Sequence, residues 1–122
     1  MNEEDFVNEE IVEFEIDKKK FKYKPTTAGE ENDWLNEYMV TDKEGKPKQD
    51  FSKLNKCKVD NIKSMPYDKE TIMKIIGIDK EWKNLNKEEK WKLLGKLKPG
   101  IFDKIIRKIN DIDRPDDAKK KD

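Results

Sequence analysis

Two adjoining amphipathic segments between residues 86 and 112 constrain the fold more than any other part of the chain. Asn86 and Glu89 have the spacing of a capping box, in which a side-chain oxygen and a carboxylate accept hydrogen bonds from free N–H groups at a helix start. The apolar residues that follow recur at helical spacing and are Trp91, Leu93, Leu94 and Leu97. Pro99 interrupts this helix because it lacks an N–H, and proline is favoured as the first residue of a helix. We therefore predict two helices that are joined by a short break and pack as a hairpin or corner.

The second of these helices carries a long apolar stripe. Its members recur at intervals of three and four residues and are Ile101, Phe102, Ile105, Ile106, Ile109 and Ile112. This spacing places them on one face of a helix, which the rest of the fold or a partner must cover. We favour core packing for this face. The candidate partner-binding residues on it are Ile101, Phe102, Ile105 and Ile109.

Residues 11–24 predict a β-hairpin, because apolar and charged side chains alternate in two successive runs. We expect a turn at residues 17–20. The register set by this turn pairs Ile16 with Phe21, Phe14 with Tyr23, Glu15 with Lys22 and Glu13 with Lys24. Each pair of opposite charges stabilises the hairpin by about 0.2–1 kcal/mol. A two-stranded hairpin is not stable alone in water, so its apolar face needs a cover.

We expect that cover from residues 27–39. Thr27 and Glu30 form a second capping-box candidate. The helix behind them, of about three turns, carries a stripe that consists of Trp34, Leu35, Tyr38 and Met39. Three of these residues are also candidate partner-binding residues, namely Trp34, Tyr38 and Met39. Glycine, proline and charged residues then predict a loop over residues 41–50.

Residues 51–65 fit two interpretations. Their apolar positions fit a helix, whereas the alternation in residues 56–59 and the proline that follows the segment favour an extended chain. We favour the extended form. Asp68 then predicts a helix N-cap and Gly77 its C-cap, and residues 79–85 predict one further turn.

These elements predict an α+β fold, with an N-terminal β-hairpin plus helix followed by a mostly α-helical C-terminal bundle. A chain of 122 residues has the size of one domain, which we place at residues 11–112. We expect residues 1–10 to be frayed, because they are acidic. We expect residues 113–122 to form a disordered tail, because Ala118 is their single apolar residue.

Charge is divided unevenly along a chain that is neutral overall. Residues 1–50 contain 8 basic and 15 acidic residues, a net charge of −7, and residues 51–122 contain 20 and 13, a net charge of +7. We favour neutralisation of the two halves within one fold over head-to-tail association between copies, although a homo-oligomer stays possible.

The residue types exclude several classes of chemistry. Cys57 is the single cysteine and histidine is absent, so one chain cannot form a disulfide, a zinc site of cysteine or histidine, or a His-based triad. The glycines are scattered rather than gathered in a phosphate-binding loop. The acidic N-terminus differs from an export signal, and the apolar runs are too short to cross a membrane. We expect a cytoplasmic protein that is not an enzyme and has no cofactor, metal or membrane partner.

A nucleic-acid-binding or regulatory role is the alternative function. Basic residues surround Trp82 and Trp91, and such interleaving is typical of surfaces that bind single strands. These basic residues are Lys80, Lys83, Lys87, Lys90 and Lys92. The other interpretation has both tryptophans in the core and the lysines in solvent, and the spacing of Trp91 supports it. We therefore regard a nucleic-acid partner as the weaker alternative.

A strand pair, a turn that begins with aspartate and a Thr-Ala-Gly-Glu cap follow one another in the first 40 residues. The residues that carry this pattern are Phe14, Ile16, Asp17, Lys19, Phe21, Thr27, Ala28, Gly29 and Glu30. In this stretch the chain resembles the tail assembly chaperones of long-tailed phages and archaeal viruses. Lys18 stands where that family would have glycine.

The resemblance implies a non-catalytic protein that is absent from the mature virus particle. Such a protein would coat the apolar helices of a tape-measure protein, keep them soluble and recruit tail-tube subunits. Both apolar stripes described above, at residues 34–39 and 101–112, are candidates for the surface that binds these partners.

Overall fold

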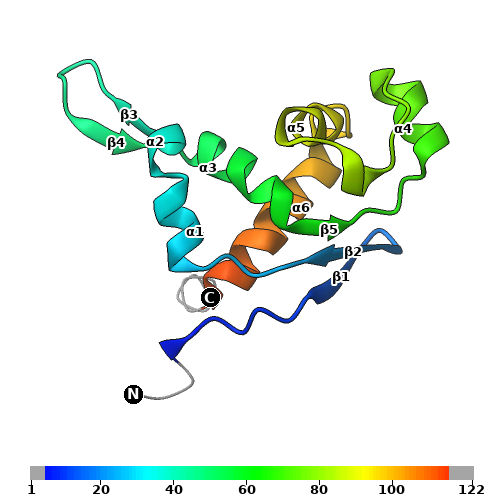
Figure 1. Ribbon diagram of the computed structural model, residues 1–122, viewed down its shortest axis with the longest axis horizontal. Coiled ribbons are helices and arrows are strands. Elements are labelled where there is room, and N and C mark those ends of the chain that lie inside the picture. The colour runs from blue at the N-terminus through cyan, green and yellow to red at the C-terminus, as the bar shows by residue number, and fades with distance from the viewer. Residues whose placement is uncertain (1–4, 116–122) are drawn as a thin grey trace.

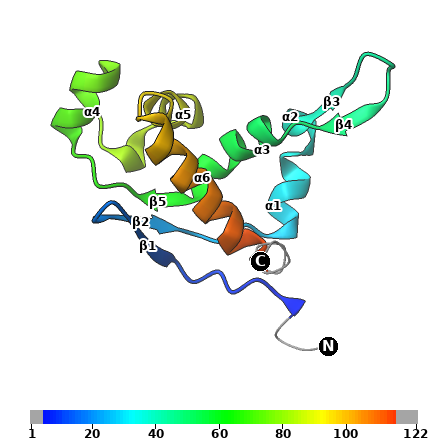
Figure 2. The ribbon, with the colours of Figure 1, turned by 180° about the vertical axis from the view of Figure 1, so that it is seen from behind.

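A three-stranded antiparallel sheet, with the long helix α6 along one of its faces, forms the centre of the protein (Figures 1 and 2). The computed structural model describes residues 5–115. The sheet has the order β1 (Val12–Ile16), β2 (Lys19–Tyr23) and β5 (Ile62–Ser64), and β3 (Met39–Thr41) pairs separately with β4 (Pro47–Gln49). The helices are α1 (Ala28–Asp33), α2 (Leu35–Tyr38), α3 (Phe51–Lys58), α4 (Lys69–Ile76), α5 (Lys87–Leu94) and α6 (Pro99–Asp113), with single 3-10 turns at Val59–Asn61 and Trp82–Asn84. The α+β prediction is confirmed.

The N-terminal hairpin forms, but the predicted register is wrong by two residues. Its pairs are Val12–Tyr23, Glu13–Lys22, Phe14–Phe21, Glu15–Lys20 and Ile16–Lys19. The turn has two residues, Asp17 and Lys18, whose φ values are +50° and +69°. Positive φ at both positions is typical of a type I′ turn, whose twist matches that of the strands it joins. A shift of two residues keeps each side chain on its predicted face, so the apolar face is still buried.

The helix expected over residues 27–39 is shorter than predicted. Its capping box is confirmed, because the Glu30 N–H donates to Thr27 Oγ1 at 3.2 Å and the Thr27 N–H donates to Glu30 Oε1 at 3.1 Å. The helix then breaks at Trp34, and Met39 already belongs to β3. α1 buries none of its residues, so packing does not prolong it, and the β-branched Val40 and Thr41 favour a strand.

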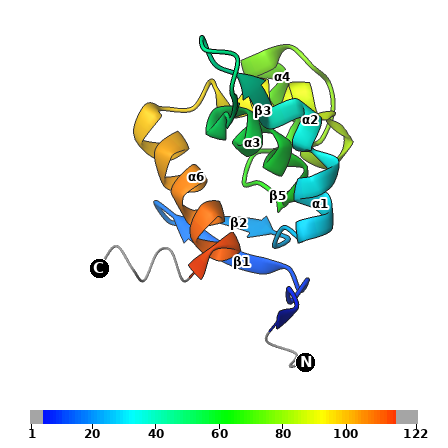
Figure 3. The ribbon, with the colours of Figure 1, turned by 90° about the vertical axis from the view of Figure 1, so that its left-hand side faces the viewer.

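This segment also does not cover the hairpin, contrary to prediction. The inner side chains of the hairpin belong to a core cluster in which residues 34–39 take no part. The cover comes instead from α6 and from residues 59–65. Figure 3 shows α1 and α2 at the opposite end of the molecule from the β1–β2 turn.

Two further predictions are wrong between residues 41 and 65. The expected loop at 41–50 contains most of the β3–β4 hairpin, whose turn includes Gly45 with φ +82°. The segment expected to be extended is mainly helix α3, because Asp50 Oδ1 accepts a hydrogen bond from the Lys53 N–H at 3.2 Å and so caps the helix. Only residues 62–64 form a strand, β5.

The C-terminal helices agree with the sequence. Asp68 caps α4, which ends at Gly77 with φ +73°, and Pro99 is the first residue of α6. The capping box before α5 has hydrogen bonds of 2.8 and 2.9 Å between Asn86 and Glu89. The core joins both halves of the chain and contains Phe14, Ile16, Phe21, Tyr23, Val59, Ile62, Met65, Ile72, Ile76, Trp82, Leu85, Leu93, Leu94, Ile105 and Ile109.

The folded part of the chain continues two residues beyond the predicted domain end at residue 112. Asp113 is the last residue of α6 and its side chain is buried, and Arg114 forms an ion pair with Glu31 at 2.9 Å. Residues 113 and 114 thus belong to the folded part of the chain rather than to a tail. Residues 1–4 and 116–122, which complete the two ends expected to lack order, lie outside the described residues.

Ion pairs connect the acidic front of the chain with its basic back. Besides Glu31 and Arg114, Asp17 pairs with Lys104 at 3.1 Å, and Glu37 pairs with Lys87. These contacts support neutralisation of the two halves within one fold.

Candidate functional site

The structure packs all four partner-binding candidates of α6 within or against the core. Ile105 and Ile109 are fully buried, and Ile101 and Phe102 are half-buried against the core, where Phe102 contacts the ring of Trp91 edge-on at 5.6 Å between centroids. Of the other candidates, Tyr38 is buried, and Trp34 and Met39 are half-buried. These seven residues lie in two separate regions of the fold and do not form one continuous surface.

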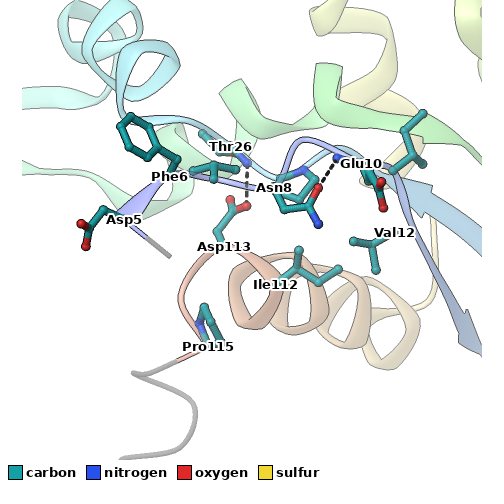
Figure 4. A pocket seen from close by; sticks show the side chains of 12 residues that line it. Asp5, Phe6, Asn8, Glu10, Val12, Thr26, Ile112, Asp113 and Pro115 are labelled. Carbon is teal, nitrogen blue, oxygen red and sulfur yellow. Dashed lines mark hydrogen bonds between the residues drawn. The ribbon is translucent and has the colours of Figure 1, made fainter. Parts of the chain in front are cut away.

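An exposed apolar surface lies instead on the segment before β1. Phe6, Val7 and Ile11 are all exposed, and Phe6 is 66% accessible to solvent. They line a hollow of about 460 Å³ together with Val12 and Ile112. Figure 4 shows Ile112 and Val12 facing the hollow from α6 and β1, with Phe6 across from them. We call this the N-terminal hollow.

Acidic and polar side chains surround this apolar lining. Asp5 and Glu10 lie at its rim, and Asn8 Oδ1 accepts a hydrogen bond from the Glu10 N–H at 3.0 Å (Figure 4). An exposed apolar cluster with a polar rim is typical of a protein-binding site. The sequence signal for it was the presence of Phe6 and Val7 in the segment that we expected to be frayed, and of Ile11 directly after it.

The inner wall of the N-terminal hollow is fixed by a buried ion pair. Lys58 Nζ lies 2.9 Å from Asp113 Oδ2, and the two side chains are 0% and 2% exposed. Lys58 also donates to Asn110 Oδ1 at 2.8 Å. Asp113 accepts two further hydrogen bonds at 2.8 Å, from the Tyr23 hydroxyl to Oδ2 and from the Thr26 N–H to Oδ1.

This polar cluster is complete, so it holds the fold together rather than offering a free reactive group. Because Tyr23 donates to Asp113, the hydroxyl of Thr26 donates to Tyr23 at 2.8 Å and accepts from Asn61 Nδ2 at 3.3 Å. Burial, and next the charge of Asp113, raise the pKa of Tyr23 above its ordinary range. Tyr23 therefore stays protonated and cannot serve as a base.

Cys57 is equally unsuited to nucleophilic chemistry. Its thiol is buried and donates to Glu37 Oε2 at 3.0 Å, and Lys87 Nζ lies 3.9 Å from its sulfur. Burial and then this hydrogen bond raise the pKa of Cys57 to about 12, which keeps the thiol in its unreactive protonated form. Lys87 in turn holds the pKa of Glu37 below its usual range. The prediction of a small half-buried cysteine underestimated its burial.

The lysines around Trp82 and Trp91 do not form an open basic face. Trp82 is buried and donates from Nε1 to the Ile62 carbonyl at 2.7 Å, so its ring is not available to stack on a base. Lys90 is buried, lies over the Trp82 ring and pairs with Asp60 at 3.2 Å. The remaining ion pairs in this region join Lys80 to Glu89, Lys83 to Glu81 and Lys87 to Glu37.

Residues 5–115 contain neither a metal-binding cluster nor a membrane-spanning helix. Within this range no three acidic or cysteine side chains gather in a way that could hold a metal ion. In the same part of the chain no helix has the length and apolar character needed to cross a membrane.

Known proteins add no further indication of function. Comparisons with protein-family models, with curated proteins and with solved structures found no match to this chain.

Proposed function

We propose that this chain is a non-catalytic protein-binding factor that acts as a chaperone in the assembly of a viral or proviral tail. Its partners in this proposal are a helical tape-measure protein and tail-tube subunits. The observation that carries the binding role is the N-terminal hollow, where exposed apolar side chains gather on a chain of which 46% is charged. Water-exposed apolar surface of this kind is stabilised when a partner covers it.

The tail-assembly part of the proposal is supported by the hairpin and the helix cap that follows it. The residues that resemble tail assembly chaperones form the β1–β2 hairpin and the capped start of α1. Lys18, which stands where that family would have glycine, has φ +69°, a conformation that glycine adopts most easily. This positive φ supports the proposal at the one position of the pattern where the residue differs.

The binding site in this proposal is the N-terminal hollow in place of the α6 stripe. An apolar side chain from a tape-measure helix would enter between Phe6 and Ile112, and the acidic rim would keep the free protein soluble. This arrangement suits transient capture, because the apolar area is small and its rim is charged.

Co-expression with the long helical protein encoded beside this chain tests the proposal. We expect that partner to become soluble and to elute together with this protein in size-exclusion chromatography with light scattering. Phe6→Asp should abolish this co-elution. Phe51→Asp is the matched control, because Phe51 is also 66% exposed but lies at the start of α3, outside the hollow. A partner that stays insoluble with the unmodified protein, or equal effects of the two substitutions, would refute the proposal.

A further inference from the structure

The outer edge of β1 is an unpaired sheet edge. β1 is the terminal strand of the order β1-β2-β5, and no strand within residues 5–115 pairs with its other side. Figure 2 shows β1 along the lower border of the sheet, with α6 in front of the sheet face. Edge strands present a row of backbone N–H and C=O groups to any extended chain that approaches.

The register identifies the residues whose backbone groups face outwards. In a hairpin with a two-residue turn, the pair next to the turn exchanges hydrogen bonds, and such pairs then alternate along the ladder. Ile16, Phe14 and Val12 are therefore bonded to β2. The backbone groups of Glu13 and Glu15 point to the open edge, and their exposed side chains lie on the outer face of the sheet.

Helix α6 packs on one face of the sheet and approaches both ends of β1. Lys104 pairs with Asp17 at one end, and Ile112 and Val12 line the same hollow at the other, so α6 runs antiparallel to β1. A second hollow of about 320 Å³ lies between Glu15 and Lys108, and the N-terminal hollow lies at the opposite end of β1. The two hollows thus lie at the two ends of β1.

We propose that the outer edge of β1 binds, by antiparallel strand addition, an extended segment of a partner protein in which basic residues alternate with apolar ones. Glu13 and Glu15 already face lysines of β2 on their inner side. A strand added on the outer side would place its alternate side chains next to the same two carboxylates, and opposite charges there stabilise the pairing. Its other side chains would face α6, where the N-terminal hollow accepts apolar groups.

The same charges argue against a second copy of this chain as the occupant. Two β1 edges in antiparallel contact would bring glutamates opposite glutamates, which destabilises a strand pair. The lysine-bearing strand β2 cannot serve as the added strand either, because β1 and β5 occupy both of its edges. This inference rests on the proposed role as a protein-binding factor and adds the chemistry of the bound segment.

The probe is a synthetic capped peptide with the sequence KVKVKVK, added to the full-length protein labelled with ¹⁵N. We expect the amides of Glu13 and Glu15 to shift and to become protected from hydrogen exchange. In antiparallel addition the lysines of the peptide, opposite these glutamates, donate their N–H groups to β1, whereas the valine N–H groups point away. N-methylation of the lysine amides should therefore weaken binding about tenfold, and N-methylation of the valine amides should leave it unchanged.

Charge is tested with a matched pair of variants. Glu13→Gln combined with Glu15→Gln should weaken peptide binding about threefold. Glu70→Gln combined with Glu81→Gln removes two exposed carboxylates away from the edge and should have no effect. The proposal is overturned if the lysine-methylated peptide binds as tightly as the valine-methylated one, or if the Glu13 and Glu15 amides do not respond.

These outcomes separate the two proposals. Peptide binding at β1 without solubilisation of the tape-measure protein would retain the edge site and reject the tail-assembly role. If that partner co-elutes with this protein but the Glu13 and Glu15 amides in the complex are not protected from hydrogen exchange, the proposed function stands and strand addition is rejected.

Discussion

Removal of Asp113 should destabilise the protein more than removal of its partner Lys58. In the Asp113→Leu variant, the buried Lys58 ammonium keeps a single hydrogen bond, to Asn110 Oδ1, and the Thr26 N–H loses its acceptor. In the Lys58→Met variant, the Asp113 carboxylate keeps two donors, Tyr23 and Thr26. The two members of the ion pair are therefore not equivalent.

The magnitude follows from what each variant leaves unpaired. Breaking a buried ion pair by removing one partner costs about 3–5 kcal/mol. We expect Asp113→Leu near the upper end of that range, because the unpaired Thr26 N–H adds a cost of about 1–3 kcal/mol. We expect Lys58→Met near its lower end, about 3 kcal/mol. Either value is a large part of the roughly 5–15 kcal/mol that stabilises a typical domain.

Urea unfolding followed by tryptophan fluorescence measures these free energies of unfolding. The double variant Lys58→Met with Asp113→Leu removes both charges and should be more stable than Asp113→Leu alone. If Asp113→Leu does not fold, the expected result is that the double variant does. Arg114→Met is the matched control, because it removes a more exposed ion pair with Glu31 and should cost no more than about 1 kcal/mol. The reasoning is refuted if Asp113→Leu costs no more than Arg114→Met, or if the two single costs add in the double variant.

Three further predictions concern other parts of the fold. Lys18→Gly should raise the free energy of unfolding by about 1 kcal/mol in the same urea titration, because glycine relieves the φ of +69° in the β1–β2 turn; Lys19→Gly, in a strand, should lower it. Glu37→Gln should reduce the fall in melting temperature at acid pH. Lys87 lowers the pKa of Glu37, so the stabilising contribution of the Glu37 carboxylate is present above pH 4.5 and is lost as pH falls through the lowered pKa. An unchanged pH profile of the melting temperature would contradict this. Cys57 should react with a maleimide at pH 8 only at the rate of local opening, since burial raises its pKa to about 12, and urea should accelerate labelling.

The sequence was most informative where a local signal and a tertiary requirement agree. The capping box at Asn86 and the N1 proline Pro99 define their helix starts through short-range hydrogen bonds and a fixed φ, which need no partner. The α6 stripe that follows Pro99 supplies Ile105 and Ile109 to the core. Both helices therefore appear where the sequence places them.

The wrong predictions share a different physical cause. In α3, the alternation of residues 56–59 suggested a strand, but the Asp50 cap and the burial of Leu54 and Lys58 on one face favour a helix. A lysine would normally mark a solvent-facing position, and Lys58 is buried because Asp113, more than 50 residues away in the sequence, lies beside it. Such a long-range ion pair leaves no local trace in the sequence.

The candidate site was missed because the sequence does not show which apolar residues the core will use. The α6 stripe was the strongest apolar signal in the chain, and the core takes it up. The large apolar side chains that remain exposed within residues 5–115 are Phe6, Val7, Ile11, Leu35, Phe51, Met73 and Ile75. Three of the seven fall within six consecutive residues and line one hollow, whereas the others are scattered over α2, α3 and α4. Single exposed apolar residues are ordinary, so this concentration beside the open edge of β1 is the reason for proposing a binding surface there.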